Sequence, residues 1–174
     1  MGDTSSSFLS IEEEKKLGLV FMHNIRHTIT LSDDPEIETY IQSLGNRLAT
    51  YSDGMERTFT FFVVMDPSIN AFAGPGGYIG INSGLILTSK SENELAAVIA
   101  HEIAHVTQRH LARAFETSSK LSMQTTAAII AAILLGQNDS QLGEAAFAAA
   151  TAGSIQKQIN FTRSNEIEAD RLGI

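Results

Sequence analysis

The sequence predicts a single, mostly helical α+β domain, and three observations carry that prediction. Apolar residues recur at helical spacing in several long segments, two of which begin with a capping-box signature. Three short runs rich in aromatic or β-branched residues have the composition of strands. The helical and extended segments stand in separate blocks instead of alternating, which is typical of the α+β class. A length of 174 residues suits one domain with a substantial core.

The first part of the chain is expected to form two helices. Ser10, with Glu13 three residues later, predicts the start of the first helix, whose apolar periodicity continues towards Leu31. The pair Asp34-Pro35 supplies the N-cap and the first helical residue of the second helix, which should end near Ala49.

The middle of the chain is expected to hold the sheet. The run TFTFFVVM, residues 58–65, predicts a strand, and INAFA and YIGIN predict two short strands that form a tight hairpin around GPGG. Ser91 and Glu94 then make a second capping box, which opens a helix expected to continue past His110. From about residue 120 to residue 174 the chain is Ala-rich and is expected to be mostly helical.

Composition excludes several kinds of partner and ligand. A formal net charge of −8 gives no basic surface, so nucleic acid is excluded as a partner. The chain has no cysteine, so any metal must be held by His, Asp or Glu. The nearest approach to a membrane span is the nine-residue run AAIIAAILL, about half of the ~18 residues that a span requires. We therefore expect no transmembrane segment in this chain.

The segment VIAHEIAHVTQRH, Val98 to His110, puts three histidines and a glutamate into a predicted buried helix. On a helix, His105 lies only about 40° from His101 and one turn further along, so both imidazoles can reach one ion. Glu102 lies about 60° from His105 on the same side, where its carboxylate can accept a proton from water at the metal. His110 points about 180° away from His101. The spacing favours a zinc site, and a helix whose histidines only make hydrogen bonds is the alternative.

A second histidine pair provides an internal comparison. His23 and His27 have the same spacing, but Asn24 stands where the glutamate would be. We expect this pair to be an incidental surface pair that holds no metal.

The HExxH stretch lacks a third ligand, which a catalytic zinc needs in addition to a position for water. A third histidine in the H-x-x-G-x-x-H style is absent, because positions 108 and 111 hold Gln and Leu. Near the end of the chain, Glu166 and Asp170 share a helical face, while Glu168 points to the opposite side. A glutamate ligand followed by a carboxylate that holds an imidazole would suit the site, but an acidic, solvated helix face has the same spacing. Spacing alone does not choose between them.

The order of motifs resembles the M48 family of zinc metallopeptidases, whose gluzincin-type site combines HExxH with ExxxD. HEIAH is followed about sixty residues later by NEIEAD, and NAFAGPGGYIGINSGLI is similar to the strand-and-turn segment of the family's periplasmic, BepA-like branch. The resemblance runs from about Ile11 to Ile174. It implies a zincin-like fold in one catalytic domain, residues 1–174, with residues 1–10 disordered. Relatives often continue into tetratricopeptide-like repeats, so the chain is expected to be truncated after residue 174.

The resemblance implies a role for each motif residue. His101, His105 and Glu166 would bind one zinc ion per chain. Glu102 would be the catalytic base. Asp170 would hold one of the ligand histidines, with His101 favoured.

The first strand of the predicted hairpin is expected to pair backbone-to-backbone with a substrate strand, which requires an unfolded or flexible polypeptide. This segment comprises Asn70, Ala71, Phe72 and Ala73. Its alternative is an ordinary sheet edge. No donor for the oxyanion is evident, and Tyr78 and Arg163 are weak candidates.

The function that the resemblance implies is that of a zinc-dependent endopeptidase, which is expected to hydrolyse flexible or misfolded proteins in envelope protein quality control. The resemblance implies a location in the periplasm or cell envelope, although this sequence has no signal peptide, and a C-terminal repeat domain or an envelope assembly partner outside this chain. The alternative is a zinc-fold scaffold that binds unfolded chains without cutting them, with the Ala-rich residues 121–155 as its partner surface. Glu102 favours the enzyme, because a scaffold does not need that carboxylate.

Overall fold

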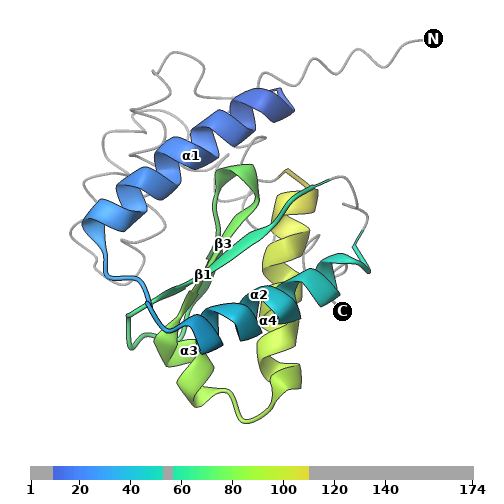
Figure 1. Ribbon diagram of the computed structural model, residues 1–174. Coiled ribbons are helices and arrows are strands. Elements are labelled where there is room, and N and C mark those ends of the chain that lie inside the picture. Colours follow the sequence, from blue (N-terminus) through green and yellow to red (C-terminus); the bar gives the residue numbers. More distant parts are fainter. Residues whose placement is uncertain (1–9, 53–56, 110–174) are drawn as a thin grey trace, which may run out of the picture.

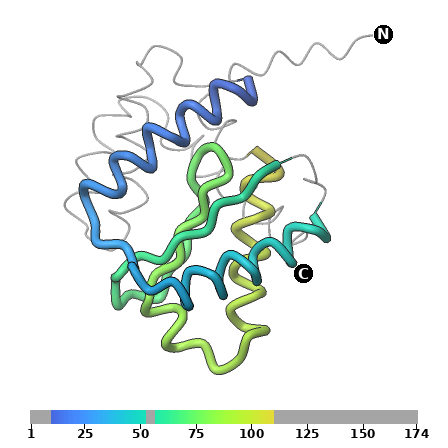
Figure 2. Tube along the Cα trace, viewed as in Figure 1, coloured from blue at the N-terminus to red at the C-terminus, as the bar shows by residue number. Residues whose placement is uncertain are grey.

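The computed structural model describes residues 10–52 and 57–109, and these fold into three layers (Figure 1, Figure 2). The elements are α1 (Ile11–Thr28), α2 (Pro35–Ala49), β1 (Thr60–Val64), β2 (Ala71–Ala73), the 3₁₀ turn η1 (Pro75–Gly77), β3 (Tyr78–Asn82), α3 (Ser83–Thr88) and α4 (Glu92–Thr107). A small sheet lies between α1 on one face and α2, α3 and α4 on the other. The α+β class is confirmed.

In the described part of the chain, the sheet has three strands in the order β1-β3-β2. β1 runs parallel to β3, while β2 runs antiparallel to β3 and is joined to it by the GPGG turn. Gly76 has φ 73°, a left-handed conformation that favours glycine, within this turn. The predicted strands and hairpin are therefore confirmed, and the parallel pairing of β1 with β3 is a feature that the sequence analysis did not predict.

The starts of α1 and α2 follow the predicted caps. Ser10 Oγ accepts a hydrogen bond from the Glu13 backbone N–H at 3.2 Å, and the Glu13 carboxylate accepts one from the Ser10 N–H at 2.8 Å. Asp34 caps α2 by accepting from the Glu36 N–H at 2.9 Å. α1 ends at Thr28, before Leu31, which instead makes an isolated bridge with Val64 of β1.

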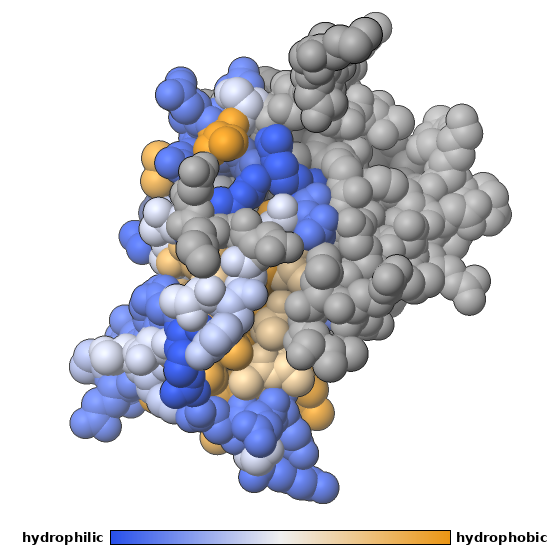
Figure 3. Space-filling model, turned by 90° about the vertical axis from the view of Figure 1, so that its right-hand side faces the viewer, coloured by the Kyte–Doolittle hydropathy of each residue, from blue (hydrophilic) through white to orange (hydrophobic). Residues whose placement is uncertain are grey.

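Two apolar clusters fill the spaces on either side of the sheet. Since side chains alternate along a strand, each strand contributes to both. The cluster between α1 and the sheet contains Leu17, Phe21, Met22, Ile25, Phe62, Val64 and Phe72. The cluster between the sheet and α2, α3 and α4 contains Ile41, Leu44, Phe59, Phe61, Val63, Ile79, Ile81, Leu85, Leu95, Ile99, Ile103 and Val106. Figure 3 shows one side of the surface, where hydrophilic residues lie above and below a smaller apolar area.

Two expectations for the region around α4 were incomplete or wrong. Ser91 Oγ accepts from the Glu94 N–H at 3.3 Å, but the Glu94 carboxylate accepts from the Lys90 N–H, so the second capping box is only half formed. The helix was expected to continue past His110, whereas it ends at Thr107, because Arg109 has φ 53° and leaves the helical region. The short helix α3, Ser83–Thr88, was not predicted, since six residues are too few to show a helical period.

α1 passes very close to the hairpin at Gly18. A Cβ built on Gly18 would lie 2.6 Å from the carbonyl oxygen of Pro75 and 3.0 Å from the Cα of Gly76. The neighbouring atoms belong to the backbone of Pro75 and Gly76, and backbone cannot move aside as a flexible side chain could. The absence of a side chain at Gly18 therefore lets α1 approach the sheet closely enough to bury Phe21.

The substitution Gly18→Ala should lower the free energy of unfolding by about 1–3 kcal/mol, because the added methyl group overpacks a backbone contact. In an exposed helix the same change would raise it by up to about 1 kcal/mol, so the sign of the effect is diagnostic. Urea unfolding followed by circular dichroism measures the difference. Leu19→Ala, at a neighbouring side chain that is 63% exposed, serves as the control and should change stability little. A stabilising Gly18→Ala would show that α1 lies farther from the hairpin.

Candidate functional site

α4 is held against the sheet by an apolar stripe that leaves the HExxH residues on another side of the helix. The stripe consists of Leu95, Ile99, Ile103 and Val106, all of them buried. Two residues along a helix correspond to a rotation of about 200°, so His101 lies about 160° from Ile99. His101, Glu102 and His105 are each half-buried. Burial of the stripe therefore directs the histidine pair away from the sheet.

The two imidazoles of α4 converge. His101 Nε2 and His105 Nε2 are 3.0 Å apart, and the ring centroids are 4.7 Å apart with an interplanar angle of 64°. A tetrahedral zinc ion with Zn–N distances of 2.0–2.1 Å separates two ligand nitrogens by roughly 3.3 Å. The pair therefore fits a shared metal ion after a small adjustment of the side chains.

The predicted third ligand lies in a part of the chain that the structure does not describe. Glu166 and its partner Asp170 both lie outside residues 10–52 and 57–109. Within those ranges, no group of three or more His, Asp or Glu side chains could hold a metal ion. The described residues thus supply two potential ligands and, directly after the first of them, the carboxylate of Glu102.

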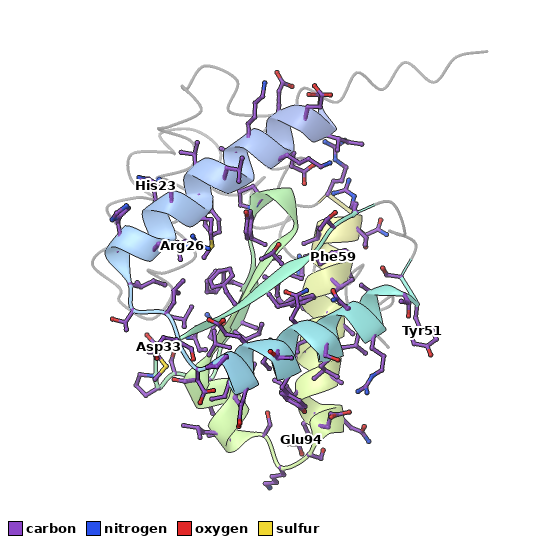
Figure 4. All side chains as sticks on the ribbon, viewed as in Figure 1. His23, Arg26, Asp33, Tyr51, Phe59 and Glu94 are labelled. Carbon is purple, nitrogen blue, oxygen red and sulfur yellow. The ribbon has the colours of Figure 1, made fainter. Side chains whose placement is uncertain are left out.

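The second histidine pair has similar local geometry in a different setting. The rings of His23 and His27 lie 4.4 Å apart at an interplanar angle of 68°, close to the values for His101 and His105. Both are exposed, on α1, and Figure 4 shows His23 at the opposite side of the molecule from α4. The i, i+4 spacing alone produces this ring contact, so the contact itself does not identify a metal centre.

β2 is the edge strand beside β3, and its register decides which backbone groups face outward. The Asn82 N–H donates to the Asn70 carbonyl at 3.0 Å, and the Gly74 N–H donates to the Tyr78 carbonyl at 2.7 Å. In an antiparallel ladder such hydrogen-bonded pairs alternate with pairs whose N–H and C=O groups point away. Ala71 and Ala73, between these pairs, therefore direct their backbone groups away from β3. Their small side chains pack on the same cluster as α4.

The start of α4 is tied to α2 by exposed polar side chains. Glu92, the first residue of α4, accepts hydrogen bonds from the Arg47 guanidinium and, at 3.0 Å, from the Tyr40 hydroxyl. These two donors hold the pKa of the Glu92 carboxyl below its ordinary value. Since the pKa is lowered in the folded state, this contribution to stability is present above the ordinary carboxyl pKa and is lost as the pH falls.

The end of α4 is held by a charged cluster that the sequence analysis missed. Glu14 of α1 is buried, with 11% exposure of its side chain, and its carboxylate lies between two guanidiniums, 3.3 Å from Arg57 Nη1 and 3.2 Å from Arg109 Nη2. The signal was present in the sequence, because position 14 falls on the buried stripe of α1 that continues through Leu17 and Phe21. A charge on an apolar stripe requires a partner, which the sequence does not identify.

One weak candidate is not supported by the structure. Tyr78 was considered as a donor for an oxyanion, but its side chain packs against the cluster between α1 and the sheet. α4 packs on the opposite face of the sheet, so Tyr78 is not brought to the histidine pair. Arg163 lies outside the described residues.

Comparison with known proteins places these features in a family. The chain matches Peptidase family M48 over residues 35–174. It is 48% identical to a putative beta-barrel assembly-enhancing protease of Vibrio cholerae and 42% identical to the beta-barrel assembly-enhancing protease of Escherichia coli strain K12. Both alignments extend over 174 residues, which are all of this chain and 36% of the relative. It is 30% identical over 135 residues, 78% of this chain and 37% of the relative, to a mitochondrial metalloendopeptidase of Schizosaccharomyces pombe.

The chain thus spans little more than a third of the length of these relatives. The match to the family includes the hairpin, α4 and the acidic segment that contains Glu166, and it covers most of the residues present. The chain therefore belongs to peptidase family M48.

Proposed function

We propose that this chain is the catalytic domain, residues 1–174, of a zinc-dependent endopeptidase. The observation that carries the proposal is the complete HExxH arrangement on α4, where two half-buried imidazoles converge with their Nε2 atoms 3.0 Å apart and the Glu102 carboxylate follows the first of them. The exposed histidine pair of α1 has a similar ring contact but lacks that carboxylate. The family and the metalloprotease names of several relatives imply a divalent metal and a polypeptide substrate. Zinc, at one ion per chain, suits two imidazoles and a carboxylate.

Each motif residue has a distinct role in this proposal. His101, His105 and Glu166 hold the ion, and Asp170 orients the imidazole of His101 through its second ring nitrogen. When bound, zinc lowers the pKa of water towards ~7 and polarises the scissile carbonyl. Glu102 accepts the proton of the attacking water and passes it to the leaving amine, because it lies beside the ligands without being one.

The substrate is proposed to be an extended, flexible polypeptide that pairs with β2. The outward backbone groups of Ala71 and Ala73 offer an N–H and a C=O each, which is the pattern that β-strand addition uses. β2 and α4 share one apolar cluster, so a strand added at this edge would extend the sheet whose one face the active-site helix covers. Phe72 points to the other face and anchors the strand against α1.

The biological setting is proposed from the relatives. The names of the bacterial relatives refer to beta-barrel assembly, which supports a role in envelope protein quality control and a periplasmic location. Within the described part of the chain, no helix is long and apolar enough to cross a membrane. A C-terminal repeat domain or an assembly partner would supply contacts beyond this chain. The second candidate, a zinc-fold scaffold that binds without cutting, is not favoured because the chain retains Glu102.

The choice of third ligand is testable with a matched pair of substitutions. Glu166→Gln should weaken zinc binding, because it removes a charged ligand, whereas Glu168→Gln makes the same chemical change on the opposite side of the predicted helix and should not. Metal analysis and chelator competition measure both. Equal loss in the two variants, or in neither, would show that another carboxylate is the ligand.

The histidine pair of α1 should bind no metal. Replacing His23 and His27 with Ala should leave about one zinc per chain, because both residues are exposed and have no carboxylate in an HExxH arrangement. Elemental analysis of purified protein gives the stoichiometry. A halved zinc content would reveal a second site.

The substitution Glu102→Gln separates the enzyme from the scaffold. It keeps the size of the side chain and removes the basic carboxylate, so zinc should stay bound while cleavage of a flexible substrate such as casein falls by about 10²–10⁴-fold. The assay is made on this chain and on the full-length protein. Zinc-loaded wild-type protein that cuts nothing in either form would favour the scaffold. Equal cleavage by wild type and Glu102→Gln would show that this carboxylate is not the base.

A further inference from the structure

The end of the HExxH helix is bound to α1 through buried charge. Glu14 Oε1 lies 3.3 Å from Arg57 Nη1, and this nitrogen also donates to the carbonyl oxygen of Val106 at 3.3 Å. Val106 directly follows His105. The guanidinium therefore contacts α4 one peptide unit from a proposed metal ligand.

The same carboxylate also reaches the residue at which the chain leaves α4. Arg109 Nη2 lies 3.2 Å from Glu14 Oε2 and forms an ion pair with it. The two groups are not aligned for a hydrogen bond, and Glu14 Oε2 accepts none among the described residues. Arg109 has φ 53°, which is uncommon for a residue with a side chain and persists where its surroundings determine it. Its N–H closes the helix end by donating to the Val106 carbonyl at 3.0 Å.

The charges of this cluster suit the end of a helix. The last carbonyls of a helix lack partners within it and carry partial negative charge, which cations stabilise. Two guanidiniums alone would repel each other, and Glu14 lies between them. All three side chains are largely buried, with 11% exposure for Glu14, 21% for Arg57 and 24% for Arg109. Low exposure makes the cluster sensitive to the loss of one partner.

We propose that Glu14 is a positioning residue for the metal centre. Through Arg57 and Arg109 it fixes the last turn of α4 and, with it, the imidazole of His105. This inference rests on the proposed ligand role of His105. A metal ligand must be held to within about 0.5 Å of its productive position, so a loosened last turn weakens metal binding without removing any ligand.

The test compares variants of the full-length protein. Glu14→Gln keeps the size of the side chain but removes the carboxylate charge that faces both guanidiniums. The zinc dissociation constant, measured by chelator competition, should rise by about tenfold or more, as it does when outer partners of metal ligands are removed. In the metal-free protein, hydrogen exchange should become faster at the last turn of α4 and stay unchanged in β1. This second readout does not depend on bound metal or on activity.

Three further variants separate positioning from general stability. Glu12→Gln makes the same charge change at an exposed site of α1 and should leave the dissociation constant unchanged. Met22→Ala removes a buried side chain from the cluster between α1 and the sheet, so it lowers stability without touching α4 and should also leave zinc binding unchanged. Arg57→Lys keeps the charge but not the fork of donors, and it should give an intermediate rise. This variant carries the test if Glu14→Gln does not fold.

The outcomes are distinguishable. Unchanged zinc affinity and unchanged exchange in Glu14→Gln, or in Arg57→Lys where that variant carries the test, would overturn the positioning role and leave the ligand assignment intact. An equal rise for Met22→Ala at a matched loss of stability would also overturn it, because the effect would then be global. Wild-type protein that binds no zinc, or that binds it equally well after His105→Ala, would overturn the ligand assignment as well as this inference.

Discussion

The packing of the α4 stripe against the sheet is the interaction on which the site depends. Ile99 and Ile103 are almost completely buried among the inward side chains of β1 and β3. Burying each such side chain contributes about 1.5–3 kcal/mol, so the rotation of α4 about its axis is strongly determined. Since His101 lies about 160° from Ile99, the same packing sets the direction in which the histidines point. One face of α4 thus forms part of the core, and another face carries His101 and His105.

The two ends of α4 are held by different kinds of contact. At the start, Glu92 meets Arg47 and Tyr40 at the surface, where water and salt screen the charges and the pair contributes little. At the end, Glu14 is buried with two guanidiniums, and removal of one partner from such a cluster typically costs about 3–5 kcal/mol. The stronger constraint therefore lies at the end closer to His105. α1, which carries no motif residue, thus bears on the geometry of the site.

The sheet edge complements the helix. The register of β2 turns the backbone groups of Ala71 and Ala73 outward, while Phe72 anchors the strand from the other face. Among the described residues these groups pair with no other strand, and outward backbone groups at a sheet edge invite association with another strand, which a protease that cuts extended chains can use. The close approach of α1 at Gly18 to the η1 turn supports this edge from behind. The contact that packs the hairpin turn against α1 therefore also supports the proposed substrate-binding edge.

Local rules were enough to predict several features from the sequence. The caps at Ser10 and Asp34 are decided by hydrogen bonds that span two or three residues, so both helix starts were predicted correctly. The hairpin followed from the GPGG turn, and the convergence of His101 and His105 followed from the helical period. The identity of the third ligand did not follow from local rules, because a carboxylate about sixty residues away can join the pair only through the tertiary fold. That assignment rests on family resemblance.

The tertiary structure decided what depends on residues far apart in the chain. α4 ends at Thr107 because Arg109 takes a left-handed conformation, next to a carboxylate on α1. No periodicity within α4 could have shown this. The parallel pairing of β1 with β3 joins strands that are separated by β2 and the GPGG turn, and the short α3 is held by Leu85, which packs in the same apolar cluster as α4. The sequence by itself determined where helices begin, where the chain turns and how the histidines are spaced, because those properties arise within a few residues; helix ends, strand order and charge pairing required the whole fold.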